Sequence, residues 1–250
     1  MKIARLPSGN PEIFHTLQGE GVDAGVPAVF IRASLCNLHC VWCDTDYTWN
    51  WEGTPWPHER DGEEGYAKFR KAEQIIEMTP AEVAAAAAAF PCRHLVLTGG
   101  EPLLQEDAFV EVLEILRAAD PDWTVEIETN GTLRPGDRCD ALVGRYNVSP
   151  KLTNSGNADD LRLRPDAIAF FRDSPKAWFK FVVADPADLA EVEGLQALLA
   201  LPPDRILVMP EARTPDGLAA RSWVAEACLR HGYRFSDRLH LRLWGARRGV

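Results

Sequence analysis

Three cysteines with the spacing CxxxCxxC, Cys36, Cys40 and Cys43, are the residues of this chain best suited to chemistry. Cysteine thiolates at close spacing hold iron–sulfur clusters. A four-iron cluster has four irons to ligate, so a loop with three cysteines leaves one iron free to bind another molecule. A zinc knuckle completed by His39 or His58 and a disulfide-bonded loop are the alternatives that spacing alone leaves open.

Polar motifs also follow the ends of the predicted strands, where an α/β sheet places its chemistry. Residues 99–101, Gly-Gly-Glu, follow the second of these strands, and their glycines give a ligand access to the backbone. Asn130 and Lys151 follow the next two strands. Arg32 interrupts the first strand. Its side chain either binds the carboxylate of a ligand or extends to the solvent-exposed edge of the sheet. Each motif alone is more often structural, but together with the cysteine loop they predict a site.

Apolar runs of strand length alternate with helical stretches along most of the chain. The predicted strands are 28–34, 94–98, 124–128, 146–149, 178–183, 205–209 and 239–243. The predicted helices are 72–90, 107–119, 161–172, 186–199 and 216–231. This alternation indicates right-handed crossovers and a mainly parallel sheet. We expect one α/β domain over residues 1–250, a partial (open) βα barrel of about six parallel strands, with a doubly wound flat sheet as the alternative.

Two segments are harder to interpret. The turn at Gln18-Gly-Glu20 is by itself typical of a plain hairpin. The Trp-rich stretch at about 50–71 predicts a long inserted loop with one helical turn at most, because long loops in compact domains are usually functional or mobile. It either covers the cysteine loop or docks a partner.

The composition excludes several classes of protein. A net charge of −10 argues against a broad nucleic-acid surface, which needs clustered lysine and arginine. No apolar run of roughly 18 residues predicts a membrane span, and no signal-peptide segment precedes the first strand. Cys92, Cys139 and Cys228 are scattered, which predicts buried free thiols in a reducing cytoplasm. We therefore expect a small-molecule substrate.

Taken together, these motifs resemble the radical S-adenosylmethionine (SAM) superfamily, in which CxxxCxxC is followed by a strand-borne Gly-Gly-Glu-Pro. Within it, the chain is similar to the 7-carboxy-7-deazaguanine synthase family. The similar stretches are 14–21, 25–32, 36–38, 42–45, 47–49, 97–102, 128–131, 148–151 and 243–250. The chain departs from the family pattern at Leu35, where glycine is common, and in the longer segment after Trp49.

The resemblance implies a lyase that converts 6-carboxy-5,6,7,8-tetrahydropterin to 7-carboxy-7-deazaguanine with loss of ammonia, in queuosine or other 7-deazapurine biosynthesis. It implies a [4Fe–4S] cluster whose free iron binds SAM, reductive cleavage of SAM to a 5′-deoxyadenosyl radical, and a Mg²⁺ ion. It also implies an electron donor such as a flavodoxin and a homodimer. The alternatives are a glycyl-radical activating enzyme that acts on a partner protein, and a non-catalytic iron–sulfur or zinc module.

The resemblance assigns residues to each group, with no catalytic side chain beyond the cofactor-driven chemistry. The cluster ligands are Cys36, Cys40 and Cys43, and Thr45 is the Mg²⁺ ligand. The SAM contacts are Trp42, Cys43, Asp44, Gly100, Glu101, Ser149, Pro150 and Lys151. The substrate contacts are Leu17, Gln18, Gly19, Glu20, Arg32 and Thr98. Asn130 is a further candidate, and His240, Trp244 and Arg248 either close the site or belong to a packed C-terminal strand.

Overall fold

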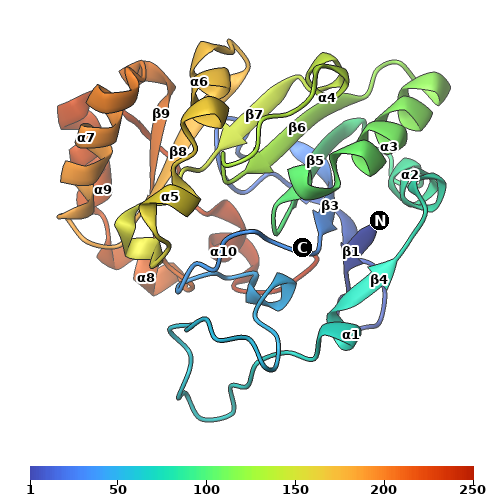
Figure 1. Cartoon of the computed structure of the whole chain (residues 1–250), viewed down its shortest axis with the longest axis horizontal. Helices are drawn as coiled ribbons and strands as arrows, with labels where there is room; N and C mark the ends of the chain where they lie inside the picture. Colours follow the sequence, from blue (N-terminus) through green and yellow to red (C-terminus); the bar gives the residue numbers. More distant parts are fainter.

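In the computed structural model, which describes all 250 residues, one sheet of ten strands runs through the chain (Figure 1). Seven strands are parallel, in the order β10-β9-β8-β7-β6-β5-β3. They are β3 (Pro27–Ala33), β5 (His94–Gly99), β6 (Thr124–Thr129), β7 (Arg145–Val148), β8 (Ala177–Val183), β9 (Ile206–Pro210) and β10 (Arg234–Phe235). The sheet has two free edges and does not close, which confirms the open barrel predicted from the sequence.

Three short antiparallel strands extend the sheet beyond β3. They are β1 (Lys2–Ala4), β2 (Ile13–Leu17) and β4 (Ile75–Glu77). Strand β2 pairs with residues 27–31 of β3, so the turn that follows it is brought beside the barrel.

The chain has ten α-helices, and most of them lie along the outer side of the curved sheet, whereas the last lies on its inner side (Figure 1). They are α1 (Lys71–Gln74), α2 (Pro80–Ala88), α3 (Glu106–Ala119), α4 (Asp137–Leu142), α5 (Asp159–Arg162), α6 (Pro165–Asp173), α7 (Asp188–Leu199), α8 (Pro215–Ala220), α9 (Trp223–His231) and α10 (Leu239–Trp244). A core of 39 buried residues fills the space between them and the sheet. No helix combines the length and the apolar character needed to cross a bilayer.

Strand residues alternate between this core and the inner side of the barrel. In β8, for example, Phe179 and Phe181 belong to the core, whereas the side chain of Lys180 lines an inner cavity. Side chains of a strand point to opposite faces with a period of two, so each strand supplies both the core and the site. The inner face is therefore polar while the outer face is apolar.

Some sequence predictions were wrong in detail. The predicted helix 72–90 is divided, because Ile75–Glu77 pairs with β1 as an edge strand and α2 begins only after the capping box of Thr79 and Glu82. The predicted helices 161–172 and 216–231 are each two shorter helices. Cys92 is only partly buried, unlike Cys139 and Cys228.

The predicted strand 239–243 is the helix α10. Its leucines alternate with polar residues as in a half-buried strand, but Leu241 is buried while Leu243 is half exposed. The amide of Leu241 instead donates to the carbonyl of Arg238, a local helical contact, and the sheet edge is taken by β10.

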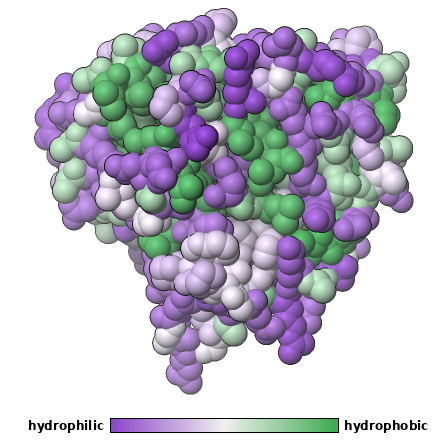
Figure 2. Space-filling view, in the orientation of Figure 1, coloured by the Kyte–Doolittle hydropathy of each residue, from purple (hydrophilic) through white to green (hydrophobic).

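Residues 50–70 form the predicted long loop, which has no helical turn of its own and is followed by α1. The loop projects from the lower side of the molecule in Figure 1, and its surface in Figure 2 is pale to hydrophilic. Its inner side packs on the cysteine loop: the rings of Trp56 and His39 stack 3.4 Å apart. The loop therefore covers the cysteine loop from outside.

Candidate active site

One cavity of about 480 Å³ opens at the carboxyl ends of the parallel strands. It collects residues from β2, β3, β5, β6, β7, β8, the cysteine loop and the C-terminal tail. All of the predicted site residues line it except Glu101 and Pro150, and so do Asn130, His240 and Arg248 but not Trp244. The fold thus brings together residues that are up to 240 positions apart in the chain.

The three cysteines of the CxxxCxxC loop are free thiols on the wall of this cavity. Side-chain amides lie beside two of them: Asn157 Nδ2 is 3.4 Å from Cys40 Sγ, and Asn130 Nδ2 is 4.0 Å from Cys36 Sγ. Burial raises the pKa of all three thiols, that of Cys43 to about 12. A bound metal supplies the positive charge that ionises such thiols, so this donor set fits an iron–sulfur cluster with three protein ligands.

The outer side of this loop is held by the inserted segment. The Nε2 atom of the buried His58 lies 2.9 Å from the carbonyl oxygen of Cys43, and the Glu59 amide donates to the carbonyl of Val41. His58 is therefore occupied by the protein and does not reach the thiols as a fourth zinc ligand. The ring of His39 is stacked between the loop and Trp56.

The Gly-Gly-Glu turn has a packing role as well as a place at the cavity. A Cβ atom on Gly100 would lie 1.9 Å from the carbonyl oxygen of Leu35, so only glycine allows β5 to approach the start of the cysteine loop. Glu101 is fully buried, and its carboxylate accepts hydrogen bonds from the Thr129 hydroxyl and the Asn130 amide. Both oxygens of Glu101 therefore bind the protein in this structure, and Glu101 remains a predicted SAM contact only from behind the cavity wall.

A cationic group lies at the β3 side of the cavity. Arg32 Nε donates to Glu12 Oε1 at 3.0 Å, and Arg248 donates to the other oxygen of the same carboxylate at 2.6 Å. The guanidinium of Arg248 also stacks on the ring of Tyr47, 3.4 Å from its centre. The C-terminal tail thus closes this side of the cavity.

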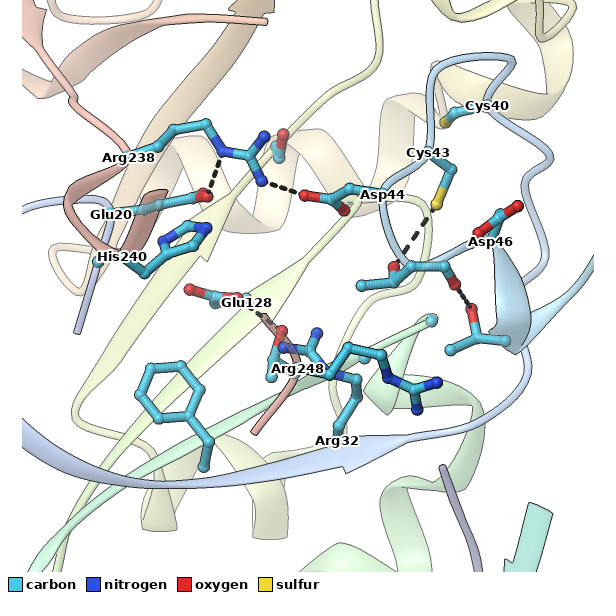
Figure 3. A pocket seen from close by; sticks show the side chains of 18 of the residues that line it. Glu20, Arg32, Cys40, Cys43, Asp44, Asp46, Glu128, Arg238, His240 and Arg248 are labelled. Atoms are coloured by element: carbon cyan, nitrogen blue, oxygen red, sulfur yellow. Dashed lines mark hydrogen bonds and ion pairs between the residues drawn. The ribbon is translucent and has the colours of Figure 1, made fainter. Parts of the chain in front are cut away.

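A second network holds the turn at 18–20 at the opposite side. Glu20 pairs with the buried Lys180 of β8 and accepts from Arg238 Nε at 3.0 Å. Arg238 also binds Asp44 from the cysteine loop (Figure 3). One arginine therefore connects the turn at 18–20 with the cysteine loop.

Glu128 links two further predicted residues. Its Oε2 atom accepts from the Thr98 hydroxyl at 2.6 Å, and its Oε1 atom accepts from Gln18 Nε2 at 3.2 Å. Gln18 is itself buried, and its amide nitrogen donates to Glu126 Oε1 at 2.6 Å. The Gln18 side chain is therefore held in one orientation, with its oxygen accepting from the Glu20 amide.

Near the cysteine loop, Lys151 Nζ donates to the Ser149 hydroxyl at 3.0 Å and lies 5.5 Å from the centre of the Trp42 ring. Cys43 Sγ and the Thr45 hydroxyl are 3.5 Å apart. A Cβ atom on Gly19 would lie 2.3 Å from His240 Nδ1, so the turn needs glycine where α10 crosses it.

Sequence reasoning missed several charged residues that line the cavity, among them Glu12, Glu128, Lys180 and Arg238. Two of them carried a usable signal. Lys180 interrupts an apolar strand, and Glu128 follows Glu126 at strand spacing, so both acids share one face. Glu12 and Arg238 lie outside such patterns.

The class of protein follows from comparison with known families. Residues 31–151, which contain the cysteine loop and the strand ends up to Lys151, match the Radical SAM superfamily.

Full-length relatives define the particular family. The chain is 38% identical over 242 residues to a 7-carboxy-7-deazaguanine synthase from Pyrobaculum aerophilum, covering 95% of each chain. It is 36% identical to that of Halobacterium salinarum, covering 93% of this chain and 89% of the relative. The crystal structure of QueE from Escherichia coli superposes with a TM-score of 0.65 at 26% identity, covering 96% and 95% of the two chains. The chain belongs to the 7-carboxy-7-deazaguanine synthase family of radical SAM enzymes.

Proposed function

We propose that the cavity converts 6-carboxy-5,6,7,8-tetrahydropterin to 7-carboxy-7-deazaguanine with loss of ammonia. The observation that carries this proposal is the meeting, in one cavity, of a three-cysteine loop with a polar wall that has a free guanidinium face. The family membership of the full chain supports the same activity.

The cysteine side of the cavity is assigned to the cofactors. Cys36, Cys40 and Cys43 would hold a [4Fe–4S] cluster, whose free iron would bind SAM, and together these groups supply the one-electron cleavage that begins hydrogen abstraction. Lys151 places a cation where the carboxylate of SAM is expected, while Trp42 offers an aromatic face beside it. Asp44, Gly100 and Ser149 complete this side, and Pro150 and Glu101 support it from behind the cavity wall.

The β3 wall that carries Arg32 and the turn at 18–20 across the cavity are assigned to the substrate. Arg32 would bind the substrate carboxylate with the guanidinium nitrogens that Glu12 does not use, because a guanidinium pairs with a carboxylate through two parallel hydrogen bonds. Leu17, Gln18 and Gly19 would hold the pterin ring, with Thr98 and Glu20 at its edges. Gln18 and Thr98 donate hydrogen bonds to Glu128, and Glu20 accepts one from Lys180. These contacts fix the orientation of the three side chains before the substrate binds.

Thr45 is assigned to a Mg²⁺ ion between the two sides. Its hydroxyl lines the cavity beside Cys43, and a hard cation with oxygen ligands suits a hydroxyl and a substrate carboxylate. This proposal includes the family's external electron donor, such as a flavodoxin, and a homodimer. It treats the chain as a single radical SAM domain in which the segment at about 50–71 is an insertion.

The experiment is anaerobic turnover by the reconstituted protein with SAM, Mg²⁺ and a chemical reductant. We expect carboxy-tetrahydropterin to be consumed and 7-carboxy-7-deazaguanine to appear. Cleavage of SAM without turnover of the pterin would disprove the proposed substrate while leaving the radical SAM activity. If no 5′-deoxyadenosine forms with or without the pterin, the cavity is not a radical SAM site.

A further inference from the structure

A second cluster of ligating side chains lies away from the cysteine loop, near the start of β5. Asp23, from the loop between β2 and β3, His94 at the first position of β5, and Glu126 of β6 each place one donor atom within 4.8 Å of the other two. His94 Nε2 and Glu126 Oε2 are 3.6 Å apart. None of these three residues lines the active-site cavity.

Two donor atoms of this cluster are buried without a partner. Glu126 is fully buried, and its Oε2 atom accepts no hydrogen bond, although Oε1 accepts from Gln18 and Asn147. The Nε2 atom of His94 is likewise buried and unpartnered. Buried polar atoms in native proteins almost always have partners, so two facing orphans indicate a missing group.

The tautomer of His94 is determined by its other nitrogen. Nδ1 lies 2.8 Å from the Thr124 hydroxyl, and that hydroxyl donates to the carbonyl of Arg93 at 3.4 Å. Thr124 therefore accepts from Nδ1–H, which leaves the lone pair of Nε2 directed at the Glu126 carboxylate. A lone pair facing an ionised carboxylate is repulsive unless a cation or a proton lies between them. A ligating histidine is usually oriented by such a hydrogen bond from its second nitrogen.

The third donor completes a set that suits a metal. One imidazole nitrogen and two carboxylate oxygens are ligands that zinc accepts at about 2.0–2.2 Å, with water in a remaining position. Asp23 is partly exposed, which gives an ion a path from solvent. Arg145 pairs with the same carboxylate at 2.9 Å through Oδ2, and a carboxylate has a second oxygen for the metal.

We propose that Asp23, His94 and Glu126 form a second metal site, which binds a divalent cation of the zinc type near the amino-terminal ends of β5 and β6. The site fastens the loop between β2 and β3 to two strands of the sheet. Glu126 connects the ion to the active-site turn. One of its carboxylate oxygens would bind the metal, and the other, Oε1, accepts the hydrogen bond from Gln18. The ion therefore stabilises the turn that carries Gln18, Gly19 and Glu20, without taking part in the chemistry.

The test is a metal count on the cluster-reconstituted protein. Wild type, His94→Gln and Asp23→Asn are incubated with Zn²⁺, desalted, and analysed for zinc and iron per chain. We expect one zinc per wild-type chain, and a loss of zinc affinity of about tenfold or more in either variant, since even outer-shell changes at metal sites cost 10–100-fold. Iron per chain should be equal in all three proteins, which shows that the cysteine loop is loaded. Asp23→Asn changes a loop residue, so it tests the site even if His94→Gln folds poorly.

His231→Gln is the matched control, because His231 also lies beside a carboxylate, Glu193, at 3.3 Å but on the surface. This variant should retain zinc. Equal zinc binding by the wild type and both site variants would overturn the proposal, as would anomalous scattering at the zinc edge that shows no ion between the three side chains. None of these readouts depends on turnover, so failure of the proposed activity would leave the metal site intact.

Discussion

The Glu12 carboxylate accepts a hydrogen bond from Arg32 Nε at 3.0 Å, and both residues line the cavity. Glu12 is fully buried and also accepts from the Tyr47 hydroxyl at 3.1 Å and from Arg248. The terminal nitrogens of Arg32 form no hydrogen bond within the chain, so they are available to a ligand. A buried acid thus positions a cation whose free face suits a carboxylate.

Arg32→Lys should weaken substrate binding and leave the cluster intact. Lysine keeps the charge but lacks the planar pair of donors, and a hydrogen bond to a charged group contributes about 1.5–3 kcal/mol. We expect the KM for carboxy-tetrahydropterin to rise about 10–100-fold, while iron content stays at the wild-type level. Arg93→Lys, at a surface pair with Asp120, is the control and should change neither quantity. An unchanged KM in Arg32→Lys would remove Arg32 from the substrate site.

Cys40→Ala should abolish cluster binding and activity together, because two thiolates cannot hold a four-iron cluster. The measurement is iron and sulfide per chain after anaerobic reconstitution, with visible absorption as a second readout. Cys92→Ala is the matched control, since Cys92 is a free cysteine outside the cavity. Full cluster content in Cys40→Ala would assign the ligand to another residue.

The ion pair of Glu20 and Lys180 should make stability depend on pH. Burial opposes the ionisation of Glu20, but the charges of Lys180 and Arg238 outweigh it and hold the pKa of this carboxyl below its ordinary value of 4.5. Since the folded pKa lies below the unfolded one, the stabilisation is present above about pH 4.5 and is lost as the pH falls further.

Lys180→Met tests this relationship. It should lower the free energy of unfolding by about 3–5 kcal/mol near neutral pH, because it removes one partner of a buried pair. The decline below about pH 4.5 should become shallower, because the pKa of Glu20 moves back toward its unfolded value. Urea denaturation of cluster-free protein measures both effects, as acid releases iron. Lys176→Met, at a half-exposed pair with Asp140, is expected to cost less than about 1 kcal/mol. An equal loss in the free energy of unfolding for Lys180→Met and Lys176→Met would contradict the prediction that the buried ion pair matters more than the half-exposed one.

Leu35 is a strained position before the first cysteine, with φ at +78°. A leucine in this left-handed region carries a steric cost of about 1–2 kcal/mol that glycine avoids. Leu35→Gly should therefore be more stable than Leu35→Ala by about 1 kcal/mol, because both lose the side chain but only glycine relieves the backbone. Chemical denaturation of the two variants gives the difference directly. A more stable alanine variant would show that the strain is absent.

The parallel strands β3 and β5 to β9 and most helices could be predicted because their signals are local, whereas the short strands β1, β2, β4 and β10 were not predicted. Strand β8 is recognisable from Trp178 to Val183 by its apolar run, and the start of α2 by the capping box of Thr79 and Glu82. The predictions failed where a tertiary contact overrides local preference. Ile75–Glu77 became an edge strand because β1 was there to pair with it, and 239–243 became a helix because the sheet edge was already occupied.

The sequence by itself determined which residues can hold a cluster and at which strand ends they lie, because CxxxCxxC spacing and strand periodicity act over a few residues. Only the tertiary structure decided that Glu101 is a buried acceptor, that Glu12 positions Arg32, and that Arg238 joins Glu20 to Asp44. Hydrogen bonds and ion pairs between residues far apart in the chain depend on the packing of the whole barrel, and no local pattern encodes them.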